Sequence, residues 1–100
     1  MTTYLLAYRR PNDYTPGDPE AMTAWQGFFA NLGHNLVDPG NPVFESTSIG
    51  DCGPATSLGG YSLITADSLE AAVAVAKGSP SLSAGGVEVG EITPLLGGTD

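Results

Sequence analysis

The sequence predicts a single α+β domain whose elements follow in the order strand, helix, strand, strand, helix, strand. Its 100 residues suffice for one hydrophobic core and not for two. Two segments carry apolar residues three and four positions apart, the period of a helix, and the segments around them are apolar or alternating and bounded by Gly and Pro. We expect residues 1–100 to form one domain that ends in a flexible tail over residues 94–100.

The first half of the chain contains the clearest strand and the clearest helix. Tyr4–Tyr8 is a continuous apolar run, typical of a strand covered on both faces. The first helix is predicted over Pro19–Leu32, because Asp18 supplies an N-cap acceptor, Pro19 suits the first helical position and Glu20 lies near the positive end of the helix dipole. Its apolar stripe is predicted to comprise Met22, Trp25, Phe29, Leu32 and Leu36.

The middle of the chain is predicted to contain two strands. The segment His34–Asp38 is short and extended, and the turn residues of Pro39–Pro42 follow it. Val43–Ile49 alternates and contains Thr and Phe, so it is predicted to be a second, weaker strand. Gly59-Gly60 then opens a clear strand over Tyr61–Thr65.

The last third is predicted to contain a helix, a loop and a strand. Ala66–Glu70 starts the second helix, whose buried face is predicted to consist of Leu69, Ala72, Val73 and Ala76. Ser79–Gly86 is predicted to be a loop and Val87–Ile92 the last strand. The resulting order is that of a ferredoxin-like split βαβ sandwich, β-α-β-β-α-β, with both helices on one face of an antiparallel sheet.

The other face of such a sheet is left uncovered. The predicted strands show no consistently polar side for it to present to water. Only 14% of the residues are charged, which is few for a small monomer. We therefore expect a homodimer in which two sheets pack face to face.

Charge and ligand counting exclude several classes of function. The net charge of −8 disfavours nucleic acid and anionic membranes, since both require clustered cations. No apolar stretch approaches the roughly 18 residues of a membrane helix, and no export signal is recognisable. The single cysteine, Cys52, indicates a reducing cytoplasm. One histidine, one cysteine and no phosphate-binding glycine motif predict no metal and no nucleotide cofactor.

Two stretches carry a family resemblance. They are Gly59–Ala72, which reads Gly-Gly-Tyr-Ser-Leu-Ile-Thr-Ala-Asp-Ser-Leu-Glu-Ala-Ala, and the Gly-Gly-Val-Glu-Val-Gly-Glu-Ile strand of Gly85–Ile92. With Asn35–Gly40, they make the chain resemble the YCII-related (DGPF-type) proteins from Tyr4 to Ile92. The resemblance implies a dimeric α+β barrel. Most members have no assigned reaction, and a few similar proteins act on small chlorinated aromatic compounds, with a His–Asp pair as the proposed chemistry.

The candidate catalytic pair here is His34 and Asp38. His34 is the only histidine, and imidazole is the side chain best suited to proton transfer near neutral pH. In the similar proteins the histidine lies within the first helix, whereas His34 follows it. Four residues of strand span about 13 Å, so the pair meets only if the chain bends or if two protomers contribute. The alternative is a polar residue that follows a helix C-terminus, where the dipole favours it.

The candidate binding residues are aromatic. An apolar cavity between the sheet and the helices, suited to a small organic ligand, is predicted to be lined by Tyr4, Tyr8, Trp25, Phe28, Phe29 and Tyr61. Arg9, with its neighbour Arg10, is a candidate for binding a ligand carboxylate. The alternatives are ordinary core packing for the aromatic residues and surface pairing with acids for the two arginines.

The sequence thus predicts a cytoplasmic homodimer of unassigned activity. It is expected to bind a small aromatic or cyclic organic molecule in an apolar pocket. The alternative is a cofactor-independent lyase or isomerase that acts on such a molecule with His34 as general base. A third possibility is a purely structural dimer module.

Overall fold

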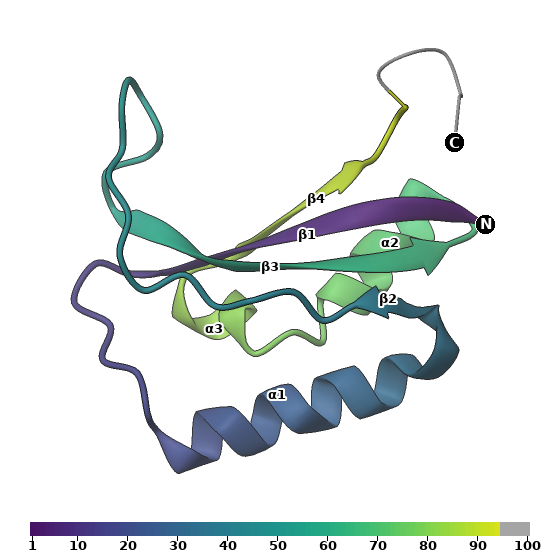
Figure 1. Ribbon diagram of the computed structural model, residues 1–100, viewed down its shortest axis with the longest axis horizontal. Helices are drawn as coiled ribbons and strands as arrows, with labels where there is room; N and C mark the ends of the chain where they lie inside the picture. The colour runs from purple at the N-terminus through teal and green to yellow at the C-terminus, as the bar shows by residue number, and fades with distance from the viewer. Residues whose placement is uncertain (95–100) are drawn as a thin grey trace.

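A computed structural model of the protein describes residues 1–94, which contain a four-stranded antiparallel sheet and a few helices (Figure 1). The predicted α+β class is therefore confirmed. The strand order is β2-β3-β1-β4. The central strands are β1 (Thr2–Pro11) and β3 (Thr56–Ala66), and the shorter β2 (Leu36–Asp38) and β4 (Val87–Glu91) form the edges. Both central strands are longer than the sequence indicates, and Gly59-Gly60 lies within β3 rather than before it.

One face of the sheet carries the hydrophobic core. Alternate residues of β1 and β3 are buried on it, as the period of two in a strand requires. Helices α1 (Pro19–Leu32) and α2 (Leu69–Ala76) complete the core. The buried apolar residues are Tyr4, Leu6, Tyr8, Phe28, Leu32, Ile64, Ala66, Ala72 and Ala76. The opposite face carries the intervening residues, among them the exposed Leu5 of β1.

Helix α1 has the predicted bounds and the predicted cap. The Asp18 carboxylate accepts a hydrogen bond from the Glu20 backbone N–H at 3.1 Å, and Gly33 ends the helix with a φ of 56°. The predicted stripe is only partly right, because Met22 is 58% exposed and Phe28 is buried. The stripe that packs on the sheet therefore runs through the second half of the helix.

The predicted strand over Val43–Ile49 is wrong. The chain touches the edge of β3 only briefly there, through a bridge between Pro42 and Gly60 and a hydrogen bond from the Val43 N–H to the Gly59 carbonyl at 3.1 Å. Beyond that point the segment is a loop. The strand of this region is β2, within the segment that the sequence marks only as short and extended.

Helix α2 begins as predicted, with the Ser68 hydroxyl accepting a hydrogen bond from the Ala71 N–H at 3.1 Å. Its buried residues are Ala72 and Ala76, whereas Leu69 is 49% exposed, contrary to expectation. The predicted loop over residues 79–86 contains a short helix, α3 (Ser81–Ala84). No helix in the described part of the chain has the length and apolar character needed to cross a bilayer. The predicted tail, residues 94–100, lies outside the described residues except for Pro94.

Candidate functional site

A cleft of about 480 Å³ lies between α1, the adjacent ends of β1 and β3, and the segment of residues 39–44. Figure 1 shows α1 running beneath the sheet on this side. Most of the lining is apolar, and six aromatic residues contribute to it: Tyr8, Tyr14, Trp25, Phe29, Phe44 and Tyr61. A cleft of this size and character can hold a small organic molecule.

An irregularity in the sheet shapes the cleft. The pairing of β1 with β3 shifts between Tyr8 and Arg9, where β3 carries Gly59 and Gly60. Gly60 has a φ of 148°, which side chains other than that of glycine rarely allow. Nearby, Gly40 approaches β3 so closely that a Cβ atom would overlap the carbonyl oxygen of Tyr61. These glycines let segment 39–42 lie directly along β3 and form one wall of the cleft.

The aromatic wall of the cleft, formed by Tyr8, Trp25 and Phe29, is held by contacts between rings. The ring of Trp25 meets that of Tyr8 edge to face, with centroids 4.6 Å apart. On α1 itself, Trp25 lies 6.0 Å from Phe28 and 5.8 Å from Phe29, measured between centroids. Such arrangements add to the stabilisation from area burial and hold each ring in place. The wall therefore presents fixed ring surfaces toward the cleft.

A chain of buried hydroxyls lies behind the wall. The Tyr8 hydroxyl donates to the Ser62 hydroxyl at 2.8 Å, and Ser62 donates to the carbonyl of Pro39 at 2.7 Å. Because a carbonyl can only accept, the direction of both bonds is determined. Burial raises the pKa of Tyr8 above its usual value, although the bond to Ser62 partly opposes this. The phenol consequently stays protonated at neutral pH.

The two arginines border the cleft and hold the long loop between β2 and β3. Arg9 donates from Nε to the Thr56 hydroxyl at 3.0 Å and from Nη2 to the Thr56 carbonyl at 2.8 Å. Arg10 donates from Nε to the Val43 carbonyl at 3.2 Å and from Nη2 to the Phe44 carbonyl at 2.8 Å. The two guanidinium groups thus bind opposite ends of the loop, mainly through backbone carbonyl oxygens.

Most of the predicted binding residues meet at this cleft. Five of the six line it: Tyr8, Arg9, Trp25, Phe29 and Tyr61. Tyr4 does not, because it lies further along β1 in the core and is only 2% exposed. Phe28 also belongs to the core rather than to the lining.

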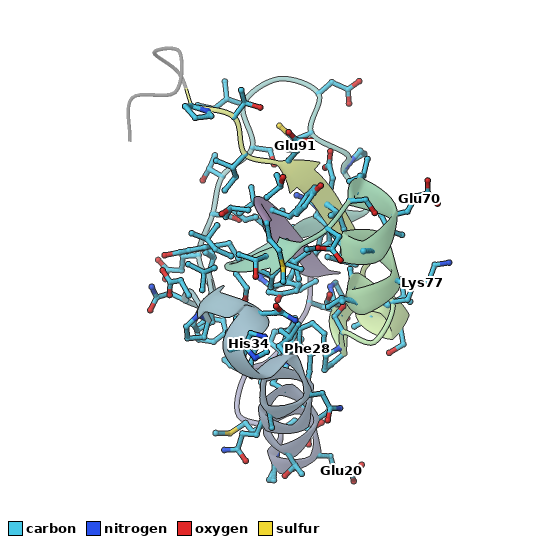
Figure 2. The ribbon with its side chains drawn as sticks, turned by 90° about the vertical axis from the view of Figure 1, so that its right-hand side faces the viewer. Glu20, Phe28, His34, Glu70, Lys77 and Glu91 are labelled. Carbon is cyan, nitrogen blue, oxygen red and sulfur yellow. The ribbon has the colours of Figure 1, made fainter. Side chains whose placement is uncertain are left out.

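The two predicted catalytic residues lie elsewhere. His34 is exposed in a single 3₁₀ turn, η1 (Gly33–Asn35), at the end of α1 (Figure 2). Asp38 is also exposed, and its carboxylate accepts a hydrogen bond from the Gly40 N–H at 2.8 Å. That bond stabilises the turn that leads into segment 39–42. Neither residue lines the cleft.

The structure adds lining residues that the sequence did not single out for binding. Tyr14, Met22, Gln26, Asn41 and Phe44 all border the cleft. The amide of Asn41 donates to the hydroxyl of Tyr61 at 3.1 Å, which ties segment 39–42 to β3 by a side-chain bond as well. Tyr14 and Phe44 are aromatic residues in loops close to prolines. This pattern could have marked them as candidate binding residues rather than core residues.

Within residues 1–94, no three His, Cys, Asp or Glu side chains come together in a way that could hold a metal ion. Cys52 is exposed, and its thiol donates to the carbonyl of Ile49 at 3.4 Å. Comparison of the chain with protein-family models, curated proteins and solved structures finds no match in any of the three.

Proposed function

We propose that the protein binds a small aromatic or cyclic organic molecule in the cleft between α1 and the sheet. The observation that carries this proposal is that five residues from three separate parts of the chain line one cleft with a predominantly apolar surface. Its volume of about 480 Å³ falls within the usual range of roughly 300–1,000 Å³ for small-molecule sites.

Two exposed apolar side chains at the rim of the cleft favour an apolar ligand. Met22 is 58% exposed and Phe44 is 50% exposed, and both border the cleft. A ligand seated against them removes their apolar surface from water, which is favourable by about 25 cal/mol per Å². The edge-to-face rings of Tyr8 and Trp25 offer a flat ligand a surface that needs no rearrangement.

The test uses a neutral planar probe, naphthalene-1-carboxamide, in isothermal titration calorimetry. We expect binding to the wild-type protein, at least threefold weaker binding to Phe44→Ala and unchanged binding to Leu69→Ala. Leu69 is a matched control because it is 49% exposed on α2 and does not border the cleft. Absence of binding at millimolar concentration, or equal losses in the two variants, would refute the proposal.

We also propose that the domain is ferredoxin-like, as in YCII-related proteins, and forms a dimeric α+β barrel. The strand order β2-β3-β1-β4 and the packing of α1 and α2 against one core face support the first part. The apolar residues Leu5 and Leu63 support the second, because neither belongs to the core and the alternation of β1 and β3 places both on the opposite face.

Light scattering tests the dimer. A dimer has twice the chain mass of 10.2 kDa, and we expect Leu5→Glu to lower the measured mass to that of one chain by placing a charge in the interface. A wild-type protein that stays monomeric at micromolar concentration would refute the barrel. The alternative function is a lyase or isomerase with His34 as base. The position of His34 does not support it, because His34 lies outside the cleft.

A further inference from the structure

The charged residues of this acidic protein are distributed unevenly around the cleft. The sequence has eleven acidic residues and three basic ones. None of the ten acidic residues among those that the structure describes lines the cleft, whereas Arg9 and Arg10 both do. The remaining cation, Lys77, follows α2 and points away from the domain (Figure 2). The cleft is thus a local region of positive charge on a surface of opposite sign.

Arg10 is the better placed of the two arginines to meet a ligand. Its guanidinium bonds to the carbonyl of Phe44, a residue of the cleft rim, whereas that of Arg9 turns toward the loop around Thr56. Three of the five N–H groups of Arg10 donate to the carbonyls of Val43, Phe44 and Pro11. The other two have no acceptor among residues 1–94.

The bonds that Arg10 already makes do not neutralise it. Backbone carbonyls are uncharged, so the guanidinium keeps its full positive charge. Arg10 also borders a second, polar depression that contains Glu45. Glu45 is not among the residues that line the cleft, so toward the cleft the charge of Arg10 is opposed only by neutral groups.

We propose that the natural ligand is an aromatic carboxylate, with its ring against Trp25 and Tyr8 and its carboxylate on Arg10. This inference rests on the proposed function and adds the charge of the ligand. A guanidinium donates stronger hydrogen bonds, in better geometry, to a carboxylate than to a neutral acceptor. A cationic ligand meets the like charge of Arg10 and no acid in the cleft. The net charge of −8 opposes the anion only weakly, since exposed charges are screened beyond about 8 Å at physiological salt.

Three naphthalene probes of different charge separate the possibilities: naphthalene-1-carboxylate, its isostere naphthalene-1-carboxamide, and 1-naphthylmethylammonium. Calorimetry at pH 7 is expected to show the carboxylate binding at least tenfold tighter than the amide, and the ammonium weakest. In Arg10→Gln the carboxylate is expected to lose about tenfold more affinity than the amide, a difference that loop displacement common to both probes does not produce. Lys77→Gln is the matched control, because it changes the net charge equally at a distance from the cleft and should leave both affinities unchanged.

Arg10 also supports the loop, so Arg10→Lys is a second variant that keeps the charge. It is expected to retain part of the preference for the carboxylate, and the wild-type comparison of the three probes stands even if Arg10→Gln does not fold. Equal binding of amide and carboxylate, tightest binding of the ammonium, or an equal loss in Lys77→Gln would overturn the inference and leave the proposed function intact. If none of the probes binds, both fail.

Discussion

The buried hydroxyl chain behind the cleft makes the effects of two small substitutions unequal. Ser62 is fully buried, accepts from the hydroxyl of Tyr8 and donates to the carbonyl of Pro39. Ser62→Ala removes a partner from both neighbours. Tyr8→Phe removes only one bond, since Ser62 still donates to Pro39. Both substitutions delete one hydroxyl oxygen, yet the direction of the two hydrogen bonds predicts that Ser62→Ala is the more destabilising.

The magnitudes follow from what each substitution leaves behind. Tyr8→Phe loses one hydrogen bond, worth about 0.5–1.5 kcal/mol of unfolding free energy. Ser62→Ala leaves the buried Tyr8 hydroxyl without an acceptor, which costs about 1–3 kcal/mol. The carbonyl of Pro39 adds less, because Pro39 is exposed beside the cleft and water can replace the lost donor. We expect Ser62→Ala to destabilise the protein by about 2–4 kcal/mol in total.

The double variant Tyr8→Phe/Ser62→Ala tests whether the two hydrogen bonds run in this direction. Without the Tyr8 hydroxyl, no buried donor remains without an acceptor, so the double variant should be more stable than Ser62→Ala alone. Urea unfolding at fixed protein concentration, followed by the fluorescence of Trp25, measures all four proteins, since Trp25 is the only tryptophan and its ring lies 4.6 Å from that of Tyr8. Additive losses in the double variant would refute the directed chain.

Three further predictions concern stability. Phe28→Ala should cost about 3–5 kcal/mol and the exposed Met22→Ala less than about 1 kcal/mol, so equal shifts of the urea midpoint would contradict the assigned stripe. Gly40→Ala should prevent folding, as circular dichroism would show, whereas Gly27→Ala, in open space within α1, should raise the melting temperature by removing a penalty of about 0.8–1.0 kcal/mol. Because burial raises the pKa of Tyr8, the unfolded chain loses this proton first, and stability should fall as pH rises above about 10, with a shallower fall in Tyr8→Phe.

Local signals were enough for α1. Its cap and its glycine stop are encoded by adjacent residues, and the helix has the predicted bounds. Phe28 was missing from the predicted stripe although it stands three residues after Trp25 and four before Leu32, the same spacing that marked the others. The choice between Phe28 and Phe29 depends on how the helix turns toward the sheet, and a pattern within one helix does not contain that information.

The loop between β2 and β3 could not be predicted in the same way. Val43–Ile49 alternates like a strand, but the carbonyls of Val43 and Phe44 bond to the side chain of Arg10, more than 30 residues earlier in the chain. A side chain of β1, distant in the sequence, therefore holds this part of the loop in place. Tyr8, Trp25, Phe29 and Tyr61 of the cleft were predicted from the sequence, whereas the position of segment 39–44 beside them depends on these contacts across the sheet.

Helix α1 packs on the core from Trp25 onward, whereas its first turns before Trp25 contribute no residue to the core. Both of its buried residues, Phe28 and Leu32, lie in its second half, and the first half borders the cleft through Ala21, Met22 and Trp25. In hydrogen–deuterium exchange, the amides of the first half should therefore open locally and label early, while those near Leu32 label with the core. A ligand bound in the cleft would contact both the first half of α1 and the sheet. Its binding should therefore slow hydrogen exchange in the first half of the helix, so that amides along the whole of α1 become similarly protected.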